Sequence, residues 1–312
     1  MGRPPHRHRP PMRAGVSASC VALPHGPWPK VLDFLAERLP ALSAAQWEQR
    51  MSAGGVIDEA GTPLLPHAPL MPGARVYYYR ELEAETPVPF LEDIVHHDEH
   101  LLVADKPHFL PVTPGGRYVH ETLLVRLKRR TGIESLTPVH RIDRETAGLV
   151  AFSVRPQDRD AYQRLFREQQ VEKVYEAIAP WRPELPLPAV YRSRIVEDLQ
   201  FFRRREVPGV PNSETAIELI EACGPLGLYR LRPRSGRTHQ LRVHMNALGR
   251  PIVGDRFYPV VMHGAGAADE DHSQPLRLLA KEMVFNDPVT GAMRRFASRR
   301  ALDWPARIPD TS

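Results

Sequence analysis

One short stretch of the chain, residues 140–150, gathers the residue types that could carry out chemistry. Asp143 lies there between Arg141 and Arg144, and the small residues Thr146-Ala147-Gly148 follow. Nearby positive charge favours the ionised form of a carboxylate, so we expect Asp143 to be charged. The apolar run at 149–152 predicts a buried strand, which puts this carboxylate at a loop-to-strand junction. Such a carboxylate, beside cations that could hold phosphates, is a candidate reactive group; a surface cluster of salt bridges is the alternative.

The same stretch resembles the His-Arg-Leu-Asp-x-x-Thr-Ser-Gly-Leu signature of the RluA family of pseudouridine synthases. Other segments match this family in the right order. Residues 101–107 are similar to its opening strand and Lys-Pro turn, residues 173–177 to its Lys-x-Tyr-x-Ala strand, and residues 234–245 to its Thr-Gly-Arg-x-His-Gln-Leu-Arg-x-His motif. Residues 248–255 also fit. The resemblance spans roughly residues 90 to 292, about two thirds of the chain.

The resemblance implies an enzyme, an RNA pseudouridine synthase that isomerises specific uridines in tRNA or rRNA. This reaction breaks the C1′–N1 bond, rotates the uracil and bonds C5 to C1′, with no redox change, so no cofactor or metal is expected. The uridine must leave the RNA stack to expose its glycosidic bond. The implied fold is an α+β pseudouridine synthase fold with a largely antiparallel mixed sheet and flanking helices. Short connections and an excess of strands over helices favour the same class.

The resemblance also assigns roles to residues. Asp143 is the essential carboxylate, and whether it attacks C1′ or removes the 2′ proton stays open. Tyr175 would stack on the uracil, and Arg237 matches the family arginine that pairs with the catalytic aspartate. Arg141 would fill the gap left by the flipped base or contact a phosphate. Leu241 is expected against the floor of the site.

Three further residues are predicted to bind substrate. Lys106 and Lys173 are plausible phosphate contacts, and His140 belongs to the signature itself. His140, His239 and His244 could suggest a metal site, but we expect hydrogen-bonded structural histidines instead, and no metal.

Composition suits a polyanionic partner such as RNA. The 312 residues carry a net charge of +5, and the sequence pI is about 9.3. The two cysteines, Cys20 and Cys223, are far apart, which argues against a disulfide framework and indicates a reducing compartment, the cytoplasm. No apolar run approaches the ~20 residues of a membrane span. We expect a monomer with no obligate protein partner.

The composition changes along the chain predict three regions. Residues 1–27, rich in Pro, Arg and His, are expected to be a disordered basic tail. Residues 28–84 form a small module of two helices followed by strands, which resembles a degenerate alpha-L RNA-binding fold; a packing appendage with little RNA affinity is the alternative. Residues 85–308 are expected to form the catalytic domain.

Two other functions compete with the synthase. One is a non-catalytic RNA-binding protein on the same fold, against which the joint presence of Asp143, Tyr175 and Arg237 argues. The other is a carboxylate-based hydrolase of a small nucleoside or glycoside. It would need a second carboxylate near the first, and Glu145 is the nearest in sequence. RNA binding that weakens steeply with salt would distinguish a polyanion binder from such a hydrolase.

Overall fold

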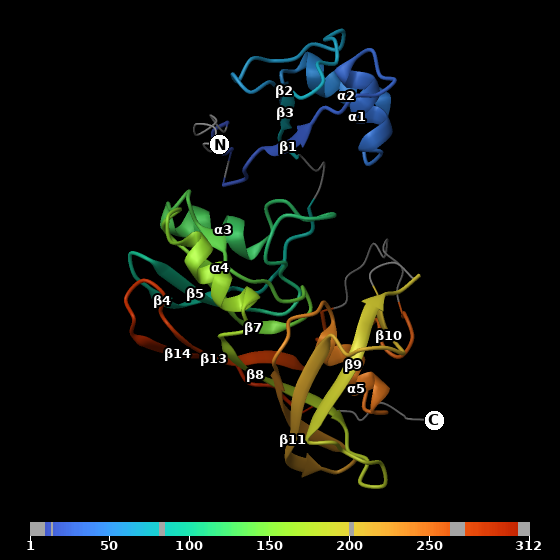
Figure 1. The fold of residues 1–312 in the computed structure, drawn as a ribbon, viewed down its shortest axis with the longest axis vertical. Coiled ribbons are helices and arrows are strands. Elements are labelled where there is room, and N and C mark those ends of the chain that lie inside the picture. The colour runs from blue at the N-terminus through green and yellow to red at the C-terminus, as the bar shows by residue number, and fades with distance from the viewer. Residues whose placement is uncertain (1–9, 14, 81–84, 200–202, 263–271, 305–312) are drawn as a thin grey trace. The chain divides into compact units, whose positions relative to one another are not determined.

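The computed structural model describes residues 10–13, 15–80, 85–199, 203–262 and 272–304. They divide into two compact units, whose helices and strands are labelled in Figure 1. Unit 1 consists of the described residues of Met1–Glu85, Gly115–His120 and Val125–Glu134. Unit 2 consists of those of Thr86–Pro114, Glu121–Leu124 and Ser135–Ser312. The helix α3, Leu123–Thr131, has residues in both.

Unit 1 packs two helices against a three-stranded antiparallel sheet. Its elements are β1 (Ser19–Ala22), α1 (Val31–Arg38), α2 (Ala44–Ser52), β2 (Val56–Ile57) and β3 (Arg75–Tyr78), with strand order β1-β3-β2. Ser43 caps the start of α2, because its hydroxyl accepts the Gln46 N–H at 3.3 Å. The core consists of Leu23, Val31, Phe34, Leu35, Trp47, Met51, Val56 and Val76.

The structure differs from the expected disorder of residues 1–27. Residues Ser19–Ala22 form β1, which pairs with β3 along its whole length, and Leu23 after it is buried. The composition of the whole segment is dominated by its Pro-, Arg- and His-rich beginning. The average composition of the segment therefore does not reveal its short apolar run, which pairs with the free edge of β3 and completes the sheet. Residues 1–9 lie outside the described residues.

The boundary between the units also differs from a simple cut after residue 84. Residues 115–120 and 125–134 belong to unit 1, although the sequence predicts them within the catalytic domain. The Glu85 carboxylate accepts the N–H groups of Val119 and His120 at 2.8 and 2.9 Å. Val16 packs with Val119 and Val125 in a small apolar cluster. These contacts join segments far apart in the sequence, which local composition does not reveal.

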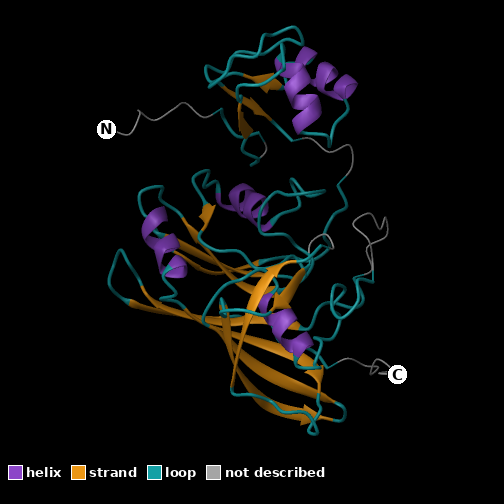
Figure 2. Ribbon diagram, turned by 45° about the vertical axis from the view of Figure 1, so that its right-hand side comes forward, coloured by secondary structure: helices purple, strands orange, loops and turns teal. Residues whose placement is uncertain are grey.

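Unit 2 is built around one eleven-stranded sheet, whose strands, like all strands in Figure 2, are drawn in orange. Its strands are β4 (Asp93–His97), β5 (Leu101–Lys106), β6 (Thr137–Pro138), β7 (Ala147–Ser153), β8 (Glu172–Pro180), β9 (Val190–Glu197), β10 (Arg204–Val207), β11 (Ser213–Cys223), β12 (Leu226–Pro233), β13 (Leu278–Asn286) and β14 (Met293–Ala297). The order is β10-β9-β11-β12-β8-β13-β7-β5-β4, with β14 beside β13 and β6 beside β7. All pairs are antiparallel except β13 with β7, which confirms the predicted α+β class.

Two helices cover different parts of this sheet. Helix α4 (Arg159–Arg167) buries Tyr162 and Leu165 in a core shared with β5, β7 and β13. Helix α5 (Gln240–Ala247) buries Leu241 and Met245 in a second core, shared with β8, β11 and β12. Burial of an apolar helix face against a sheet is the main force that fixes such a helix. The two helices therefore have fixed places at the two halves of the sheet, and each faces the site described next.

Candidate active site

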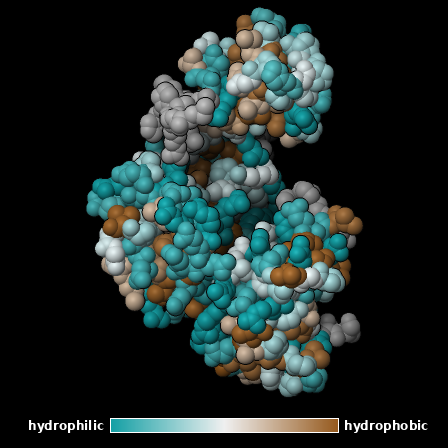
Figure 3. Space-filling model, in the orientation of Figure 1, coloured by the Kyte–Doolittle hydropathy of each residue, from teal (hydrophilic) through white to brown (hydrophobic). Residues whose placement is uncertain are grey.

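A cavity of about 820 Å³ opens in unit 2 around the loop that contains Asp143. Its walls come from this loop, from β8, from the loop between β12 and α5, and from one side of α4. The predicted site residues that line it are Arg141, Asp143, His140, Lys173, Tyr175, Arg237 and Leu241. In the face drawn in Figure 3, hydrophilic side chains predominate over the part of unit 2 that holds α4. The fold thus brings together seven of the eight predicted residues, and Lys106 is the exception.

Lys106 lies beneath the Asp143 loop and cannot reach a phosphate. Its side chain ends the buried strand β5 and has no exposed surface. The Nζ atom donates to the backbone oxygens of Pro107, at 2.9 Å, and Arg144, at 3.0 Å. Burial lowers the pKa of Lys106 to about 7, against the opposing charges of Glu145 and Asp143. The prediction of a phosphate contact is therefore wrong: this lysine holds the backbone of the loop.

The cation beside Asp143 is Arg242 on α5. Its Nη1 atom lies 3.4 Å from Asp143 Oδ2, and its side chain is 1% exposed. Asp255 holds the rest of the guanidinium, since Nε and Nη2 donate to its two oxygens at 2.8 and 2.7 Å. Burial acts to lower the pKa of Arg242, but Asp255 and then Asp143 raise it overall. Two hydrogen bonds to Asp255 thus fix the buried positive charge of Arg242 beside the candidate reactive carboxylate.

This arrangement corrects the predicted role of Arg237. Among the described residues, the cation paired with Asp143 is Arg242, with the His239 ring 3.9 Å away, and Arg237 instead donates through Nε to the Asn212 oxygen at 3.2 Å. The reason is local structure. Arg237 lies in the exposed loop before α5, whereas Arg242 lies inside this helix, where the neighbouring side chains are buried.

The two arginines that flank Asp143 in the sequence do not pair with it. Arg144 donates to Glu145 Oε1 at 2.9 Å, and Arg141 is an exposed residue at the cavity wall. Burial raises the pKa of Glu145, but Arg144 and Arg242 outweigh it, so the pKa is lowered. Glu145 is itself buried and does not line the cavity. Among the described lining residues, Asp143 is the only acidic one.

His239 contributes a second group near Asp143. Its Nε2 atom lies 3.9 Å from Asp143 Oδ2, and its Nδ1 atom lies 3.2 Å from the Tyr258 hydroxyl. That hydroxyl donates to the Arg204 oxygen at 2.9 Å and accepts the Arg204 N–H, which fixes the ring. Burial lowers the pKa of His239, although the Asp143 charge opposes it. The ring is therefore neutral at pH 7.

Tyr175 forms a flat, apolar part of the wall. It lies on β8, opposite Leu231 of β12 and Ala280 of β13, and packs on the core that contains Leu241. Burial, and then the charge of Asp143, raise the pKa of its hydroxyl above the ordinary value of 10.0. The phenol therefore stays protonated near neutral pH, and its ring offers a flat, apolar face on which a nucleobase can stack.

His140 and Lys173 are at the cavity wall, and both are already engaged. The Ala151 N–H donates to His140 Nε2 at 3.1 Å, and burial lowers the pKa of this histidine to about 3, so it is neutral. Lys173 Nζ donates to the Ser235 oxygen at 3.1 Å, and burial lowers its pKa to about 8. His140 therefore supports the loop, and Lys173 braces the β12–α5 loop while keeping donors available.

The described residues hold no group of three or more His, Cys, Asp and Glu side chains placed to bind a metal. Within the same residues, no helix is both long and apolar enough to cross a membrane.

Comparisons with known proteins indicate the family of the chain. The family model "RNA pseudouridylate synthase" matches residues 100–247. The chain is 33% identical to "Uncharacterized RNA pseudouridine synthase slr1592" of Synechocystis sp., over 73% of this chain and 79% of that protein. It is 31% identical to the dual-specificity RNA pseudouridine synthase RluA of Pasteurella multocida, over 69% of this chain and 95% of that one. A solved structure, human RNA pseudouridylate synthase domain containing 4, aligns with a TM-score of 0.52 and 25% identity over 67% of this chain and 88% of that chain.

The fold, the cavity and these relatives together define an RNA pseudouridine synthase, which is an isomerase. Within this class, the chain belongs to the RluA family. The family acts on RNA, which supports RNA as the partner of this chain.

Three residues that the sequence analysis did not place in the site belong to its geometry: Arg242, Asp255 and His239. One sequence signal could have identified Arg242. It is a charged residue between apolar neighbours in a helix that is otherwise buried, where an unpaired cation would be costly. Nothing local marked Asp255 as its partner, because the pairing depends on the fold.

Proposed function

We propose that this chain converts specific uridines of tRNA or rRNA to pseudouridine, with Asp143 as the essential carboxylate. One observation carries the assignment: Asp143 is the single described acid of the cavity, 3.4 Å from a buried arginine and near the Tyr175 ring. The same observation argues against a two-carboxylate hydrolase, because Glu145 is buried and paired with Arg144.

The chemistry is an isomerisation that the cavity can support without further reactants. The C1′–N1 bond of the target uridine breaks, and uracil keeps the bonding electrons. Asp143 assists either by bonding to C1′ or by taking the 2′ proton, and both routes need it ionised. After the base rotates, C5 bonds to C1′ as the Asp143–C1′ bond breaks or, on the second route, as Asp143 returns the proton to C2′; the C5 proton then leaves, and N1 gains a proton. Atoms and charge balance, and nothing is oxidised.

Three neighbours support these steps in the proposal. Arg242, held by Asp255, fixes the direction of the Asp143 carboxylate, and such positioning is a large part of catalysis. Tyr175 stacks on the uracil and holds it while the glycosidic bond is open. Arg141, exposed at the wall, contacts the RNA next to the flipped nucleotide.

We further propose that the chain acts as a monomer in the cytoplasm. Both cysteines are free and exposed, which suits a reducing compartment. The name of the Pasteurella relative, a dual-specificity RNA pseudouridine synthase, supports RNA as the substrate class.

The test is pseudouridine mapping on total RNA from cells that lack the protein, complemented by wild type or by Asp143→Asn. The substitution keeps the size of the side chain and removes its charge. We expect one or a few uridines to lose modification in the deletion and to regain it only with wild type. The purified variant should turn over at least roughly 10³-fold more slowly.

Circular dichroism and RNA affinity of Asp143→Asn provide the control, since both should match wild type. A non-catalytic RNA-binding protein would leave every site modified in the deletion. Full restoration by Asp143→Asn would instead show that another residue carries the reaction.

A further inference from the structure

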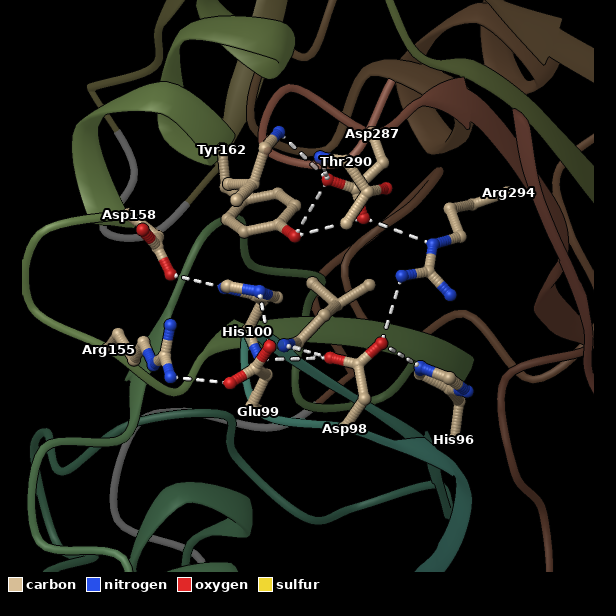
Figure 4. A network of polar contacts seen from close by, with 12 residues as sticks. His96, Asp98, Glu99, His100, Arg155, Asp158, Tyr162, Asp287, Thr290 and Arg294 are labelled. Atoms are coloured by element: carbon tan, nitrogen blue, oxygen red, sulfur yellow. Dashed lines mark hydrogen bonds and ion pairs between the residues drawn. The ribbon is translucent and has the colours of Figure 1, made fainter. Parts of the chain in front are cut away.

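Helix α4 has one face that the fold fixes firmly. Asp158, just before the helix, accepts from His100 Nδ1 at 2.8 Å, and the Tyr162 hydroxyl donates to both oxygens of Asp287 at 3.1 and 3.0 Å. Figure 4 shows these side chains meeting the β4–β5 turn and the β13–β14 turn. Arg294 links the two turns, since it binds Asp287 at 3.0 Å and Asp98 at 2.9 Å. The helix is thus held against the sheet independently of any substrate.

The opposite face of α4 lines the cavity. Gln163, Phe166 and Arg167 have the i, i+3, i+4 spacing of one helix face, and Gln169 follows the helix at the same wall. We call these four residues the α4 face. Asp143, in contrast, is surrounded by residues of α5 and β8, so the cavity has a reactive part and a part formed by α4. Nothing in the chemistry of the target uridine uses the second part.

The α4 face carries the groups that recognise an unpaired base. The Phe166 ring is half-buried and stacks on His140, with centroids 4.3 Å apart and planes 14° apart. Gln163 makes one long contact, from Nε2 to the Pro138 oxygen at 3.4 Å, and keeps its amide oxygen available. Single-stranded bases are read by stacking on aromatic rings and by hydrogen bonds to their edges, and glutamine offers both donors and an acceptor.

Gln169 occupies a position that glycine would fill more easily. Its φ is +59°, directly after the helix, where glycine or asparagine is usual. Its side chain is exposed at the cavity and makes no hydrogen bond to the described residues. A glutamine in this conformation presents its amide to the cavity at a conformational cost.

We propose that the α4 face binds a nucleotide adjacent to the target uridine and selects its base. In this subsite the base stacks on Phe166, its edge bonds to Gln163 or Gln169, and its phosphate is close to Arg167. The ion pair of Arg167 is weak, at 3.8 Å from Asp160, so its charge is available to the RNA. This inference rests on the proposed function and deepens it, because it assigns sequence selection to residues that take no part in the reaction.

The test uses the full chain and the RNA hairpin around the uridine that the mapping identifies. The hairpin is prepared with each of the four bases in turn before and after the target, with tritium at uridine C5. Release of this tritium reports the reaction. We expect wild type to prefer one base at one neighbouring position by about tenfold. Gln163→Leu or Gln169→Gly should abolish this preference and leave kcat for the other three bases within a few-fold.

The matched control is Arg164→Ala. Arg164 is on the same helix but exposed and absent from the cavity wall, so its loss should leave the base preference unaltered. Gln169→Gly also removes a strained conformation, so the variant should fold at least as well as wild type. A wild-type enzyme indifferent to both neighbours, or a preference that survives in both glutamine variants, overturns the subsite alone. Absence of tritium release from every hairpin overturns the proposed function with it.

Discussion

The Arg242 guanidinium lies among three carboxylates: Asp255, Asp143 and, at 3.9 Å from Nη1, Glu145. Asp255 takes two of its donors in a bidentate pair, and the remaining nitrogen, Nη1, lies at Asp143. The bidentate pair sets the plane of the guanidinium, so the direction of the third contact follows from it. Asp143 remains 24% exposed at the cavity, which leaves room for a substrate.

Replacement of Arg242 by lysine should therefore damage the reaction more than binding. Lysine keeps the charge but cannot bind Asp255 through two donors and reach Asp143 as well. We expect kcat to fall by about 100-fold with little change in KM. Arg237→Ala is the comparison: it removes an exposed cavity arginine and should raise KM with kcat nearly retained. Steady-state kinetics of both variants test this expectation. Equal losses of kcat would show that Arg237 also pairs with Asp143.

Lys106→Met tests whether the buried ammonium positions the Asp143 loop. Methionine fills the same space without a donor, so the Arg144 carbonyl loses its partner. We expect kcat to drop roughly 10- to 100-fold at unchanged KM.

The stability of the Lys106→Met variant gives a second readout. The folded pKa is about 7 and the unfolded one near 10.4, so wild type should gain unfolding free energy, relative to the variant, as pH rises across that interval. Urea titrations at several pH values measure this. A difference in unfolding free energy that does not change with pH would contradict the lowered pKa of Lys106.

At the level of single residues, the sequence was enough to identify cavity residues that have a distinctive side chain within a recognisable motif. Asp143 and Tyr175 are at the cavity as expected. Sequence spacing could not decide between Arg237 and Arg242, which lie in one motif five positions apart. Only the start of α5 at Gln240 puts one in an exposed loop and the other in a buried helix.

At the level of elements, Gly148 allows β7 and β13 to run in parallel side by side. Its φ is +109°, and a Cβ there would lie 2.3 Å from the Ala280 oxygen. We expect Gly148→Ala to lower the unfolding free energy by about 3 kcal/mol or more. Gly291→Ala is the control, because Gly291 also has a positive φ, +74°, but a Cβ there meets nothing within 4 Å. Its cost should be about 1 kcal/mol. The urea midpoints of the two variants measure this difference. Similar shifts would mean that the backbone moves at little cost to make room for the Cβ atom at position 148.

The contact between α4 and the β4–β5 turn should make stability depend on pH. The hydrogen bond to Asp158 raises the pKa of His100; burial opposes this, and Glu99 adds to it. A raised folded pKa contributes stability fully below the unfolded value, near 6.5, and loses it as pH rises through the folded pKa. The stability difference between wild type and His100→Gln should therefore be largest below pH 6.5 and shrink above it. Urea unfolding from pH 5.5 to 8.5 measures this, with His97→Gln, at an exposed position of β4, as the comparison. A difference that grows with pH would contradict the pair.

The elements themselves were largely predictable. Apolar side chains recur at helical spacing in the segments that form α3, α4 and α5, and this pattern in the sequence predicts each of the three helices. The strand order of the large sheet was not predictable. It depends on pairings between distant segments, such as β13 with both β7 and β8, which no local pattern encodes.

At the scale of the whole molecule, the cavity is assembled from separate parts of the chain. Asp143 and Arg242, its partner, are 99 positions apart, and the cavity wall also draws on α4 and on β8. The net charge of +5 and the arginines at the wall suit an RNA whose backbone extends past the target uridine. Phosphate contacts would then supply affinity, while the cavity supplies chemistry and base selection.

This division predicts how RNA affinity depends on salt. Each phosphate contact to a single-stranded segment contributes a slope of about −0.7 to log K against log salt concentration. Arg141→Ala should make the slope less negative by about that amount, since Arg141 is exposed at the cavity. Arg295→Ala is the control, because Arg295 is paired with Glu282 on β13 and does not line the cavity. The titrations are made in the Asp143→Asn background, so that bound RNA is not converted. An unchanged slope in Arg141→Ala would mean that this arginine fills the gap left by the flipped base, since a contact to the stacked RNA interior neutralises no phosphate.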